Sequence, residues 1–380
     1  MEILILGAGR MSQGLIYDFM KNEAITKIHI ADRDPAALQA MQGRFDDPRL
    51  TPHHMAADDL KALAPLVKRV RGMVSAVPYD YNVALTELAI ENGTHMVDLG
   101  GNNSVVQQQL HMNEQARTAD VAVIPDCGLA PGMVSVIAAY GIDQLARADE
   151  VNIRVGGLPV NPQTPLNYKL VFSVHGLINE YIEPAVILRN GHRAIVDSME
   201  GLEALSFPRP FQNLEAFYTS GGTSTLPDTF EGQINHLDYK TIRYPGHAAL
   251  MKAMMQLGFT DAQREIDLDG KKVSARQAFE ALLDAGLHYE SDDVVLIRVT
   301  VKGRKEGSDK TLVYEAVEYG DPRAGLTAMM RTTAFPVAIT LQMILDGKIK
   351  DRGVLKQELS VPGWEYMWEL KKRDIDIRES

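Results

Sequence analysis

Short apolar runs alternate with amphipathic segments over the first third of the chain. Each apolar run suits a buried strand, and each segment between the runs carries apolar residues at helical spacing. The predicted strands are Glu2–Leu6, Lys27–Ala31, Thr51–Ala56, Gly72–Ala76, Thr94–Val97 and Val121–Ile124. The predicted helices are Met11–Asn22, Pro35–Gly43, Leu60–Arg69, Tyr81–Asn92 and Ser104–Thr118. This alternation predicts an α/β domain, a parallel sheet with helices on both faces.

The pattern changes after about residue 128. Strands are predicted at Val151–Val155, Val294–Lys302 and Thr311–Tyr319, and the polar loop Gly303–Lys310 joins the last two as an antiparallel hairpin. A second, α+β domain is therefore expected, followed by an apolar helix at Thr333–Leu345. We expect domain boundaries at residues 1–128, 129–327 and 328–380.

Composition narrows the class of protein. The 380 residues include 39 Lys and Arg against 50 Asp and Glu, a net charge of −11 with no block of like charges. This balance argues against nucleic acid or an anionic membrane as a partner. The lone cysteine, Cys127, excludes internal disulfides and multi-thiolate metal sites, and no histidine spacing indicates a metal. The first strand begins at once, without a cleavable leader, so we expect a soluble, cytoplasmic protein.

Polar or special residues follow the predicted strands of the first domain. They are Gly7, Asp32, Asp58, Pro78, Asp98 and Asp126. In an open parallel sheet the carboxyl ends of the strands line the ligand crevice, so this repetition predicts a site there. An aspartate after a strand can also cap the next helix, and that alternative stays open for each one.

The first strand-to-helix turn, Gly7–Ser12, has the sequence of a dinucleotide-binding loop. Gly7 permits the tight turn, Gly9 lets the backbone approach a pyrophosphate, and the helix start supplies N–H donors. Asp32 ends the second strand, where an acid would bind the ribose hydroxyls. A Rossmann-type domain is therefore expected. Asp32 would repel a 2′-phosphate, which favours NAD, although Arg33 beside it could tolerate NADP.

Three residues are candidates for the chemistry. Asp126, after the sixth strand, could hold an amine or accept a proton. Arg243 lies among aromatic residues and could bind a carboxylate with both arms of its guanidinium, or form an ordinary surface ion pair. His247 is a possible proton carrier, or otherwise a core or surface histidine.

Several longer motifs resemble the saccharopine dehydrogenase/reductase-like family. They are Gly7-Ala8-Gly9, Val77-Pro78-Tyr79, Gly128–Gly132, Gly156–Pro159 and Thr241–Tyr244. Other motifs are most similar to those of the lysine 6-dehydrogenase branch of that family. These are Val97–Gly101, Leu188–Gly191, Glu215–Phe217, Thr219–Leu226 and Tyr239–Tyr244. The resemblance runs through nearly the whole chain.

The resemblance implies a nucleotide domain, a substrate domain on an antiparallel sheet and a C-terminal helix that returns to the first domain. Phe172 matches an aromatic position against the nicotinamide. With it, the expected cofactor residues are Gly7, Gly9, Arg10, Met11, Asp32, Arg33, Asp58, Val77, Pro78, Asp98 and Phe172. The expected substrate residues are Gly100, Asp126, Gly222, Thr223, Thr241, Ile242 and Arg243. The loop Thr219–Thr225 lacks the arginine that saccharopine reductases use for a second amino-acid moiety, which favours a smaller substrate.

The resulting expectation is an NAD-dependent enzyme that oxidatively deaminates L-lysine at its ε-carbon. The products would be ammonia and 2-aminoadipate 6-semialdehyde, which cyclises to a piperideine carboxylate. Asp126 is the first choice of base and His247 the second. The alternatives are a saccharopine or carboxynorspermidine-type reductase and a non-catalytic protein that senses nucleotides. A homo-oligomer is expected, as is common among such dehydrogenases.

Overall fold

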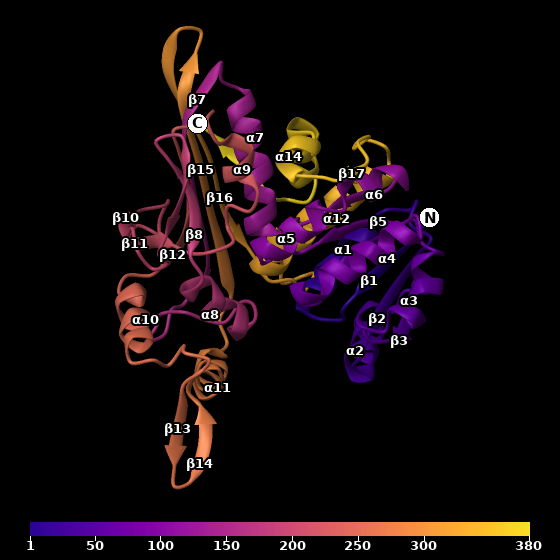
Figure 1. Cartoon of the computed structure of the whole chain (residues 1–380), viewed down its shortest axis with the longest axis horizontal. Helices are drawn as coiled ribbons and strands as arrows, with labels where there is room; N and C mark the ends of the chain where they lie inside the picture. Colours follow the sequence, from indigo (N-terminus) through magenta and orange to yellow (C-terminus); the bar gives the residue numbers. More distant parts are fainter.

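The computed structural model describes residues 1–380, the side chain of Leu268 excepted. The first sheet has the strand order β17-β6-β5-β4-β1-β2-β3, and its paired strands run parallel (Figure 1). Its strands are β1 (Glu2–Leu6), β2 (Lys27–Asp32), β3 (Leu50–His54), β4 (Gly72–Ser75), β5 (His95–Asp98), β6 (Ala122–Ile124) and β17 (Gly353–Val354). The predicted parallel sheet is confirmed, with small shifts at the strand ends.

The helices that connect these strands also match the predicted pattern, with one difference. They are α1 (Arg10–Met20), α2 (Pro35–Phe45), α3 (Leu60–Val67), η1 (Tyr79–Tyr81), α4 (Asn82–Glu91), α5 (Asn103–Leu110) and α6 (Asn113–Thr118). The single helix predicted over Ser104–Thr118 is wrong, because it is broken between α5 and α6. The N–H of Met112 turns back to the carbonyl of Gln109, and this turn buries the Met112 side chain in the core.

A second sheet stands beside the first and has the order β10-β11-β12-β7-β15-β16-β18, with β8 paired to β12 and β9 paired to β8 (Figure 1). Its strands are β7 (Arg147–Pro159), β8 (Ala185–Arg189), β9 (His192–Val196), β10 (Glu203–Leu205), β11 (Leu214–Tyr218), β12 (His236–Arg243), β15 (Asp293–Lys305), β16 (Ser308–Tyr319) and β18 (Arg378–Glu379). The expected antiparallel sheet is corrected to a mixed one. β12 pairs with β7 in parallel because the long connection between them brings the chain back to the same end.

The predicted hairpin of the second domain is confirmed, but its strands are longer than expected. β15 and β16 stay paired as far as Lys305 and Ser308, so most of the predicted loop Gly303–Lys310 is strand. Glu306 and Gly307 form the turn, and both have positive φ, as a two-residue type I′ turn requires.

The second domain also contains helices that lie beside its sheet. They are η2 (Leu129–Met133), α7 (Val134–Asp143), α8 (Val174–Ile182), α9 (Leu226–Phe230), α10 (His247–Gln256) and α11 (Ala275–Leu287). Of these, α7, α8 and α9 lie on the side that faces the first domain (Figure 1). A separate hairpin, β13 (Glu265–Leu268) with β14 (Lys271–Ser274), projects from the domain (Figure 1). Neither this hairpin nor α11 is predicted from the sequence.

The end of the chain returns to the first domain, as the resemblance implies. Its helices are α12 (Ala328–Leu345), α13 (Gln357–Ser360) and α14 (Gly363–Lys371). Gly14 of α1 allows close contact with α12, because a Cβ there would lie 2.7 Å from that of Ala334. By length and composition α12 could cross a membrane, but 89% of it is buried inside the protein, so it is a core helix.

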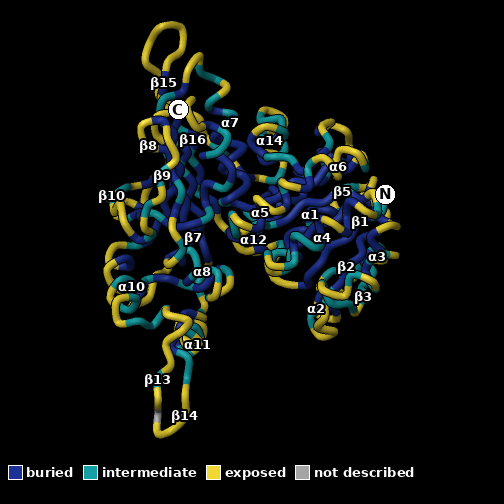
Figure 2. The backbone as a smooth tube through the Cα atoms, in the orientation of Figure 1, coloured by how far each residue is buried: buried dark blue, intermediate teal, exposed yellow. Residues whose placement is uncertain are grey.

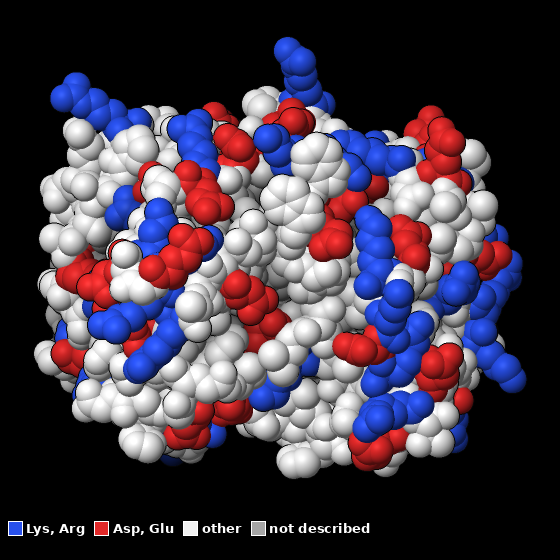
Figure 3. Space-filling model, turned by 90° about the horizontal axis from the view of Figure 1, so that it is seen from above, with Lys and Arg blue, Asp and Glu red and all other residues white. Residues whose placement is uncertain are grey.

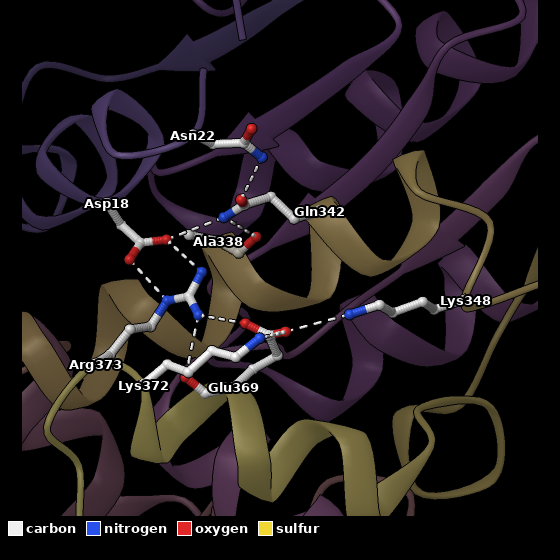
Figure 4. A network of polar contacts seen from close by, with 8 residues as sticks. All are labelled: Asp18, Asn22, Ala338, Gln342, Lys348, Glu369, Lys372 and Arg373. Carbon is white, nitrogen blue, oxygen red and sulfur yellow. Dashed lines mark hydrogen bonds and ion pairs between the residues drawn. The ribbon is translucent and has the colours of Figure 1, made fainter. Parts of the chain in front are cut away.

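A buried ion pair joins α1 to the residues that follow α14 (Figure 4). Arg373 donates to both carboxylate oxygens of Asp18, at 2.7 and 3.0 Å, and Gln342 of α12 donates to the same acid. Glu369 accepts from Arg373 at 2.8 Å. Loss of one partner of such a pair costs ~3–5 kcal/mol, so the network holds the C-terminal segment on the first domain.

Burial follows the two sheets. The central strands of both are buried, whereas the tips of the β13–β14 and β15–β16 hairpins are exposed (Figure 2). On the face shown in Figure 3, basic and acidic side chains are interspersed. Asp126 after β6 accepts from Ser224 of the second domain, and Tyr79 after β4 accepts from Asn179 of α8, so the carboxyl ends of the first sheet face the second domain.

Candidate active site

The glycine loop has the backbone geometry that a dinucleotide site needs. Gly7 has φ of +97°, and a Cβ there would lie 2.7 Å from the carbonyl oxygen of Ala76. Ser12 donates its hydroxyl to the Gly7 carbonyl at 2.6 Å, which fixes the turn. Gly9 caps α1 without a side-chain hydrogen bond, and the space beside it is open. The N–H groups at the start of α1 are therefore available to an anion.

Asp32 lies directly beside this loop at the end of β2. Its carboxylate accepts from the N–H of Ala8 at 2.6 Å and from the N–H of Asp34 at 2.8 Å. These bonds place a negative charge where a ribose would lie, and Arg33 next to it is exposed. The expectation that Asp58 directly follows a strand is wrong. β3 ends at His54, and Asp58 lies in the exposed turn before α3.

A cleft of about 380 Å³ runs between the two domains beside the glycine loop. Arg10 and Met11 form its first-domain wall, and Lys169 and His288 belong to the opposite wall. The uncapped start of α1, the open space at Gly9 and the acid at the end of β2 together fit a pyridine nucleotide. The remaining predicted cofactor residues, Val77, Pro78 and Phe172, are partly or fully exposed, and Asp98 is buried.

Asp126 is held at the meeting point of the domains. Its Oδ1 accepts from the N–H of Gly101 at 3.2 Å, and its Oδ2 accepts from the hydroxyl of Ser224 at 2.5 Å. A Cβ on Gly100 would come within 1.7 Å of Oδ1, so only glycine fits at that position. Asp126 itself has φ of +59°. The carboxylate is thus fixed by contacts from both domains rather than used as a helix cap.

The surroundings of Asp126 favour its protonated form. Burial, and the nearby charge of Asp98, raise the pKa of Asp126 to about 7, although the bonds from Ser224 and Gly101 oppose the shift. Asp98 is fully buried, and it accepts from the N–H of Asp126 at 2.9 Å and from Gln109 at 2.8 Å. Asp98 therefore fixes the backbone of Asp126, and its own carboxylate is too deeply buried to contact a cofactor. This corrects the expectation that Asp98 binds the nucleotide.

Arg243 is the buried cation of the site. Its Nε donates to the hydroxyl of Tyr181 at 2.9 Å, and a terminal nitrogen donates to the carbonyl of Ile242 at 2.9 Å. The guanidinium lies over the ring of Tyr168, 4.6 Å from its centroid. Both hydrogen-bond acceptors, the Tyr181 hydroxyl and the Ile242 carbonyl, are neutral groups. Because no carboxylate of the described residues is hydrogen-bonded to the buried guanidinium, it can bind an anionic group of a ligand.

His247 supports this cation from behind. The Tyr181 hydroxyl lies 3.0 Å from His247 Nε2, and His247 Nδ1 lies 3.0 Å from the carbonyl oxygen of Leu166. Since a carbonyl only accepts, Nδ1 carries the proton and Nε2 accepts from Tyr181. Burial, and secondarily the charge of Arg243, lower the pKa of His247 to about 3. The lone pair of His247 is therefore occupied, which argues against His247 as the base.

The other predicted substrate residues divide between the two faces of β12. Thr241 shares the face of Arg243, and its hydroxyl lies 2.7 Å from that of Thr219. Ile242 points to the opposite face and packs with Leu158 in a separate apolar cluster, because side chains alternate along a strand. Its predicted place in the site is wrong. The hydroxyl of Thr223 donates to the carbonyl of Val186 in β8, so it is already engaged by the protein rather than free for a substrate.

Several residues of the site were not predicted. Tyr239 lies on the same face as Thr241, and Gly222 is packed so closely on its ring that a Cβ would lie 2.2 Å from it. The period of two along β12 could have identified Tyr239. Ser224 lies in the loop Thr219–Thr225, but nothing in the sequence pairs it with Asp126. Tyr181 is far from Arg243 in the chain, so only the fold brings them together.

Comparisons with known proteins agree with this architecture. Residues 3–124 match the saccharopine dehydrogenase NADP binding domain, and residues 128–375 match the saccharopine dehydrogenase C-terminal domain. The saccharopine dehydrogenase (NADP+, L-glutamate-forming) of Pyricularia oryzae is 22% identical over 452 residues, which cover 100% of this chain and 98% of that protein. The carboxyaminopropylagmatine dehydrogenase of Synechocystis is 22% identical over 391 residues, with 94% and 92% covered.

A solved structure shares the whole fold. The apo saccharopine dehydrogenase (L-Glu forming) from Saccharomyces cerevisiae superposes with a TM-score of 0.82 at 21% identity, covering 100% of this chain and 99% of that one. The two matched domains meet where Ser224 of the second domain donates to Asp126 of the first. The chain therefore belongs to the saccharopine dehydrogenase family of oxidoreductases, with a pyridine-nucleotide-binding domain followed by the family's C-terminal domain.

Proposed function

We propose that this oxidoreductase oxidises L-lysine at its ε-carbon to an imine, which water then hydrolyses to ammonia and 2-aminoadipate 6-semialdehyde. NAD is the proposed cofactor, because Asp32 holds a negative charge beside the ribose position. A bound nicotinamide would supply the acceptor for the hydride that leaves the ε-carbon. Gly7, Gly9 and the start of α1 would hold its pyrophosphate.

The observation that carries this proposal is the state of Arg243. A buried guanidinium costs free energy unless an anion pairs with it, and this one bonds the neutral groups of Tyr181 and Ile242. An α-carboxylate matches the planar fork of a guanidinium and would complete its hydrogen bonds. The substrate is therefore proposed to be an amino acid anchored through its carboxylate.

Asp126 is the proposed proton acceptor. The ε-ammonium of lysine must lose a proton before its carbon can be oxidised, and a base with a pKa near the working pH transfers protons efficiently. Burial raises the pKa of Asp126 to about 7, which suits this role. The charged carboxylate would attract the ammonium, and burial would then favour the neutral pair to which proton transfer leads.

The composition of the loop beside Asp126 favours a single amino acid over a larger conjugate with a second carboxylate. The loop Thr219–Thr225 runs between Thr241 and Asp126, and it contains no arginine or lysine. A second carboxylate at this loop would find no cation of the loop itself. The match to the Pyricularia oryzae protein spans 452 positions for a chain of 380 residues, so that protein has segments that this chain lacks.

A saccharopine-type reaction is the second candidate, because relatives along the whole chain carry that name. In that case the enzyme would act on a secondary amine that joins two amino acids. Reduction of NAD and of NADP should be measured with L-lysine and with saccharopine as separate substrates. Reduction of NAD with lysine supports the proposal, whereas reduction with saccharopine alone would assign the second candidate. Nucleotide binding without any reduction would indicate a sensor.

A further inference from the structure

We propose that Glu358 of α13 is a positioning residue for Asp126. It anchors Thr225, so that the neighbouring Ser224 keeps its hydrogen bond to the Asp126 carboxylate. The C-terminal segment thereby helps to form the site at which the two main domains meet. This inference rests on the proposed function, because it concerns the group proposed as the proton acceptor. The resemblance and the comparisons assign no role to Glu358.

α13 lies beside Asp126 because of the way the strand before it joins the first sheet. β17 pairs with β6 in parallel, and Val354 stands opposite Val123. Gln357 and Asp126 each follow three residues after that pair, so both lie beyond the carboxyl end of the sheet. Gln357 is buried, and its Nε2 donates to the carbonyl of Asp126 at 2.7 Å. α13 is therefore fixed against the residue whose carboxylate is the proposed base.

Glu358, the next residue, binds the second domain. It is buried, and its carboxylate accepts hydrogen bonds from two hydroxyls of that domain. Thr225 Oγ1 lies 2.8 and 2.9 Å from the two carboxylate oxygens, and the hydroxyl of Thr229 donates to Oε1 at 2.5 Å. Lys356 donates to Thr229 at 3.1 Å, and since an ammonium only donates, the proton of Thr229 is left for Glu358. A buried carboxylate needs such bonds, so both threonines are held firmly.

Thr225 gives Glu358 the hydroxyl that would ordinarily cap a helix. It is the N-cap of α9, a position where the side chain of threonine usually accepts from an N–H of the first turn. Its side chain makes no such capping bond, and its hydroxyl donates to Glu358. The orientation of Thr225 is therefore set by the C-terminal segment rather than by α9.

Ser224 and Asp126 both have a backbone conformation that is unfavourable for residues with a side chain. Their φ angles are +44° and +59°. Residues other than glycine keep such angles where the surrounding structure holds them. Gln357 holds the carbonyl of Asp126, and Glu358 holds Thr225, which directly follows Ser224. The two residues that share the 2.5 Å hydrogen bond are thus each supported by one of two consecutive residues of α13.

Glu358 also acts on Asp126 by its charge, and the test has to separate this effect from positioning. The charge of Glu358 raises the pKa of Asp126, whereas the hydrogen bond from Ser224 lowers it. If Glu358 holds Ser224 in place, its replacement removes both effects. If Glu358 acts by charge alone, its replacement removes only the first.

The first experiment tests whether Thr225 acts through Ser224. The pKa of Asp126 is measured by ¹³C NMR of the aspartate carboxyl groups in the enzyme without substrate, and Asp126→Asn assigns the signal. Thr225→Val removes the hydroxyl without changing any charge. It should raise the pKa of Asp126 by about 0.5–1 pH unit, part of the 1–2 units expected for complete loss of the Ser224 bond. In the Ser224→Ala background it should cause no further rise, because that bond is already absent.

Two further variants are matched controls for this experiment. Thr225→Ser keeps the hydroxyl and should keep the pKa of Asp126 at its wild-type value. Thr94→Val makes the same chemical change at a buried threonine before β5, at the opposite end of the first sheet, where the hydroxyl donates to the carbonyl of Val67. It should also leave the pKa of Asp126 unchanged.

The second experiment replaces Glu358 with leucine, which removes its charge and both acceptor oxygens. In the Ser224→Ala background only the charge effect is left, so Glu358→Leu should lower the pKa of Asp126. In the wild-type background the loss of the Ser224 bond opposes this fall, which should be smaller by about 0.5–1 pH unit or reversed. Melting temperatures show whether each variant is folded, and either experiment decides the inference if the variant of the other does not fold.

The inference is overturned if Glu358→Leu shifts the pKa of Asp126 equally in both backgrounds, or if the shifts of Thr225→Val and Ser224→Ala add. Because the measurement needs no substrate, it is independent of the proposed function. A wild type that oxidises no lysine would refute that function, and the role of Glu358 would still be decided by the two experiments. If lysine is oxidised but the kcat–pH midpoint does not follow the measured pKa, Asp126 is refuted as the base while Glu358 keeps its positioning role.

Discussion

The hydroxyl of Ser224 donates a hydrogen bond to Oδ2 of Asp126, and this bond joins the loop of the second domain to the end of β6 in the first. It lowers the pKa of Asp126 against the stronger effect of burial. The protonation of the proposed base is therefore set jointly by both domains. Any movement that separates the domains would break this bond and expose the acid to water.

Replacement of Ser224 with alanine should raise the pKa of Asp126, because the donor favours the charged carboxylate. A hydrogen bond to a charged group is worth ~1.5–3 kcal/mol, so the midpoint of the kcat–pH profile should rise by about 1–2 pH units. Ser198→Ala is a matched control, since Ser198 donates to the carbonyl of Glu183 outside the site. An unchanged midpoint in Ser224→Ala would show that the kcat–pH profile does not report the protonation of Asp126.

Asp126→Asn should lower turnover by ~10²–10⁴-fold, the usual effect of losing a general base, while NAD affinity stays near wild type. The same substitution should increase stability relative to wild type at neutral pH, although it lowers turnover. The pKa of Asp126 is about 7 in the folded protein and 3.8 otherwise, so the folded state holds the proton more tightly. The free energy of unfolding of the wild type should then fall as pH rises from about 4 to about 7, by at most ~4 kcal/mol from this group.

Asparagine carries no such charge, so Asp126→Asn should gain stability relative to wild type as pH rises through this window. Melting temperatures at pH 5 and pH 8, measured on both proteins, check the sign. A helix cap would behave differently, because its loss would cost ~1 kcal/mol of stability. Lower stability together with near-normal turnover would assign Asp126 a purely structural role.

The first domain could be predicted well from the sequence because its signals are local. The apolar run Glu2–Leu6 and the turn at Gly7 each depend on neighbours in the chain, and both lie where the pattern puts them. β7 was predicted too short at Val151–Val155. Its end contains Gly156 and Gly157, which weaken a strand pattern but here allow close packing against Ile242 and Met329.

The site could be predicted only in part because its key contacts join distant segments. Arg243 and Asp126 are visible as unusual residues in motifs. The contact of Tyr181 with Arg243 and that of Ser224 with Asp126 depend on how the domains meet. Ile242 was placed in the site because it stands inside a motif, although the alternation along β12 turns it to the other face.

Arg243→Ala should weaken productive binding of lysine by ~2–4 kcal/mol, seen mainly as a higher KM, because a charge-assisted contact with two hydrogen bonds is lost. Arg243→Lys should recover only part of this loss, since a lysine cannot reproduce the fork. Cadaverine, which is lysine without its carboxylate, provides the control substrate, and its KM should change little. Wild-type lysine kinetics in Arg243→Ala would refute the carboxylate contact.

Asp32→Ala should reduce the preference for NAD over NADP, because it removes the charge that would repel a 2′-phosphate. The ratio of kcat/KM for the two nucleotides, measured at constant ionic strength, gives this preference directly. Asp32 also accepts from the N–H groups of Ala8 and Asp34, so the variant should lose some affinity for both nucleotides. A wild type that uses NADP better than NAD would show that Asp32 does not select the cofactor.

His247 provides the last prediction, since the structure makes it a support for Tyr181 and Arg243 rather than a base. His247→Gln should raise KM for lysine and leave the midpoint of the kcat–pH profile where Asp126 sets it. The pKa of His247 is about 3 in the folded protein and 6.5 otherwise, so the unfolded state binds the proton more tightly. The stability that this group contributes is present above pH 6.5 and is lost as pH falls toward 3. The difference in melting temperature between wild type and His247→Gln should therefore shrink between pH 7 and pH 5. If kcat of the variant no longer depends on pH in this range while its KM for lysine stays unchanged, His247 and not Asp126 accepts the proton.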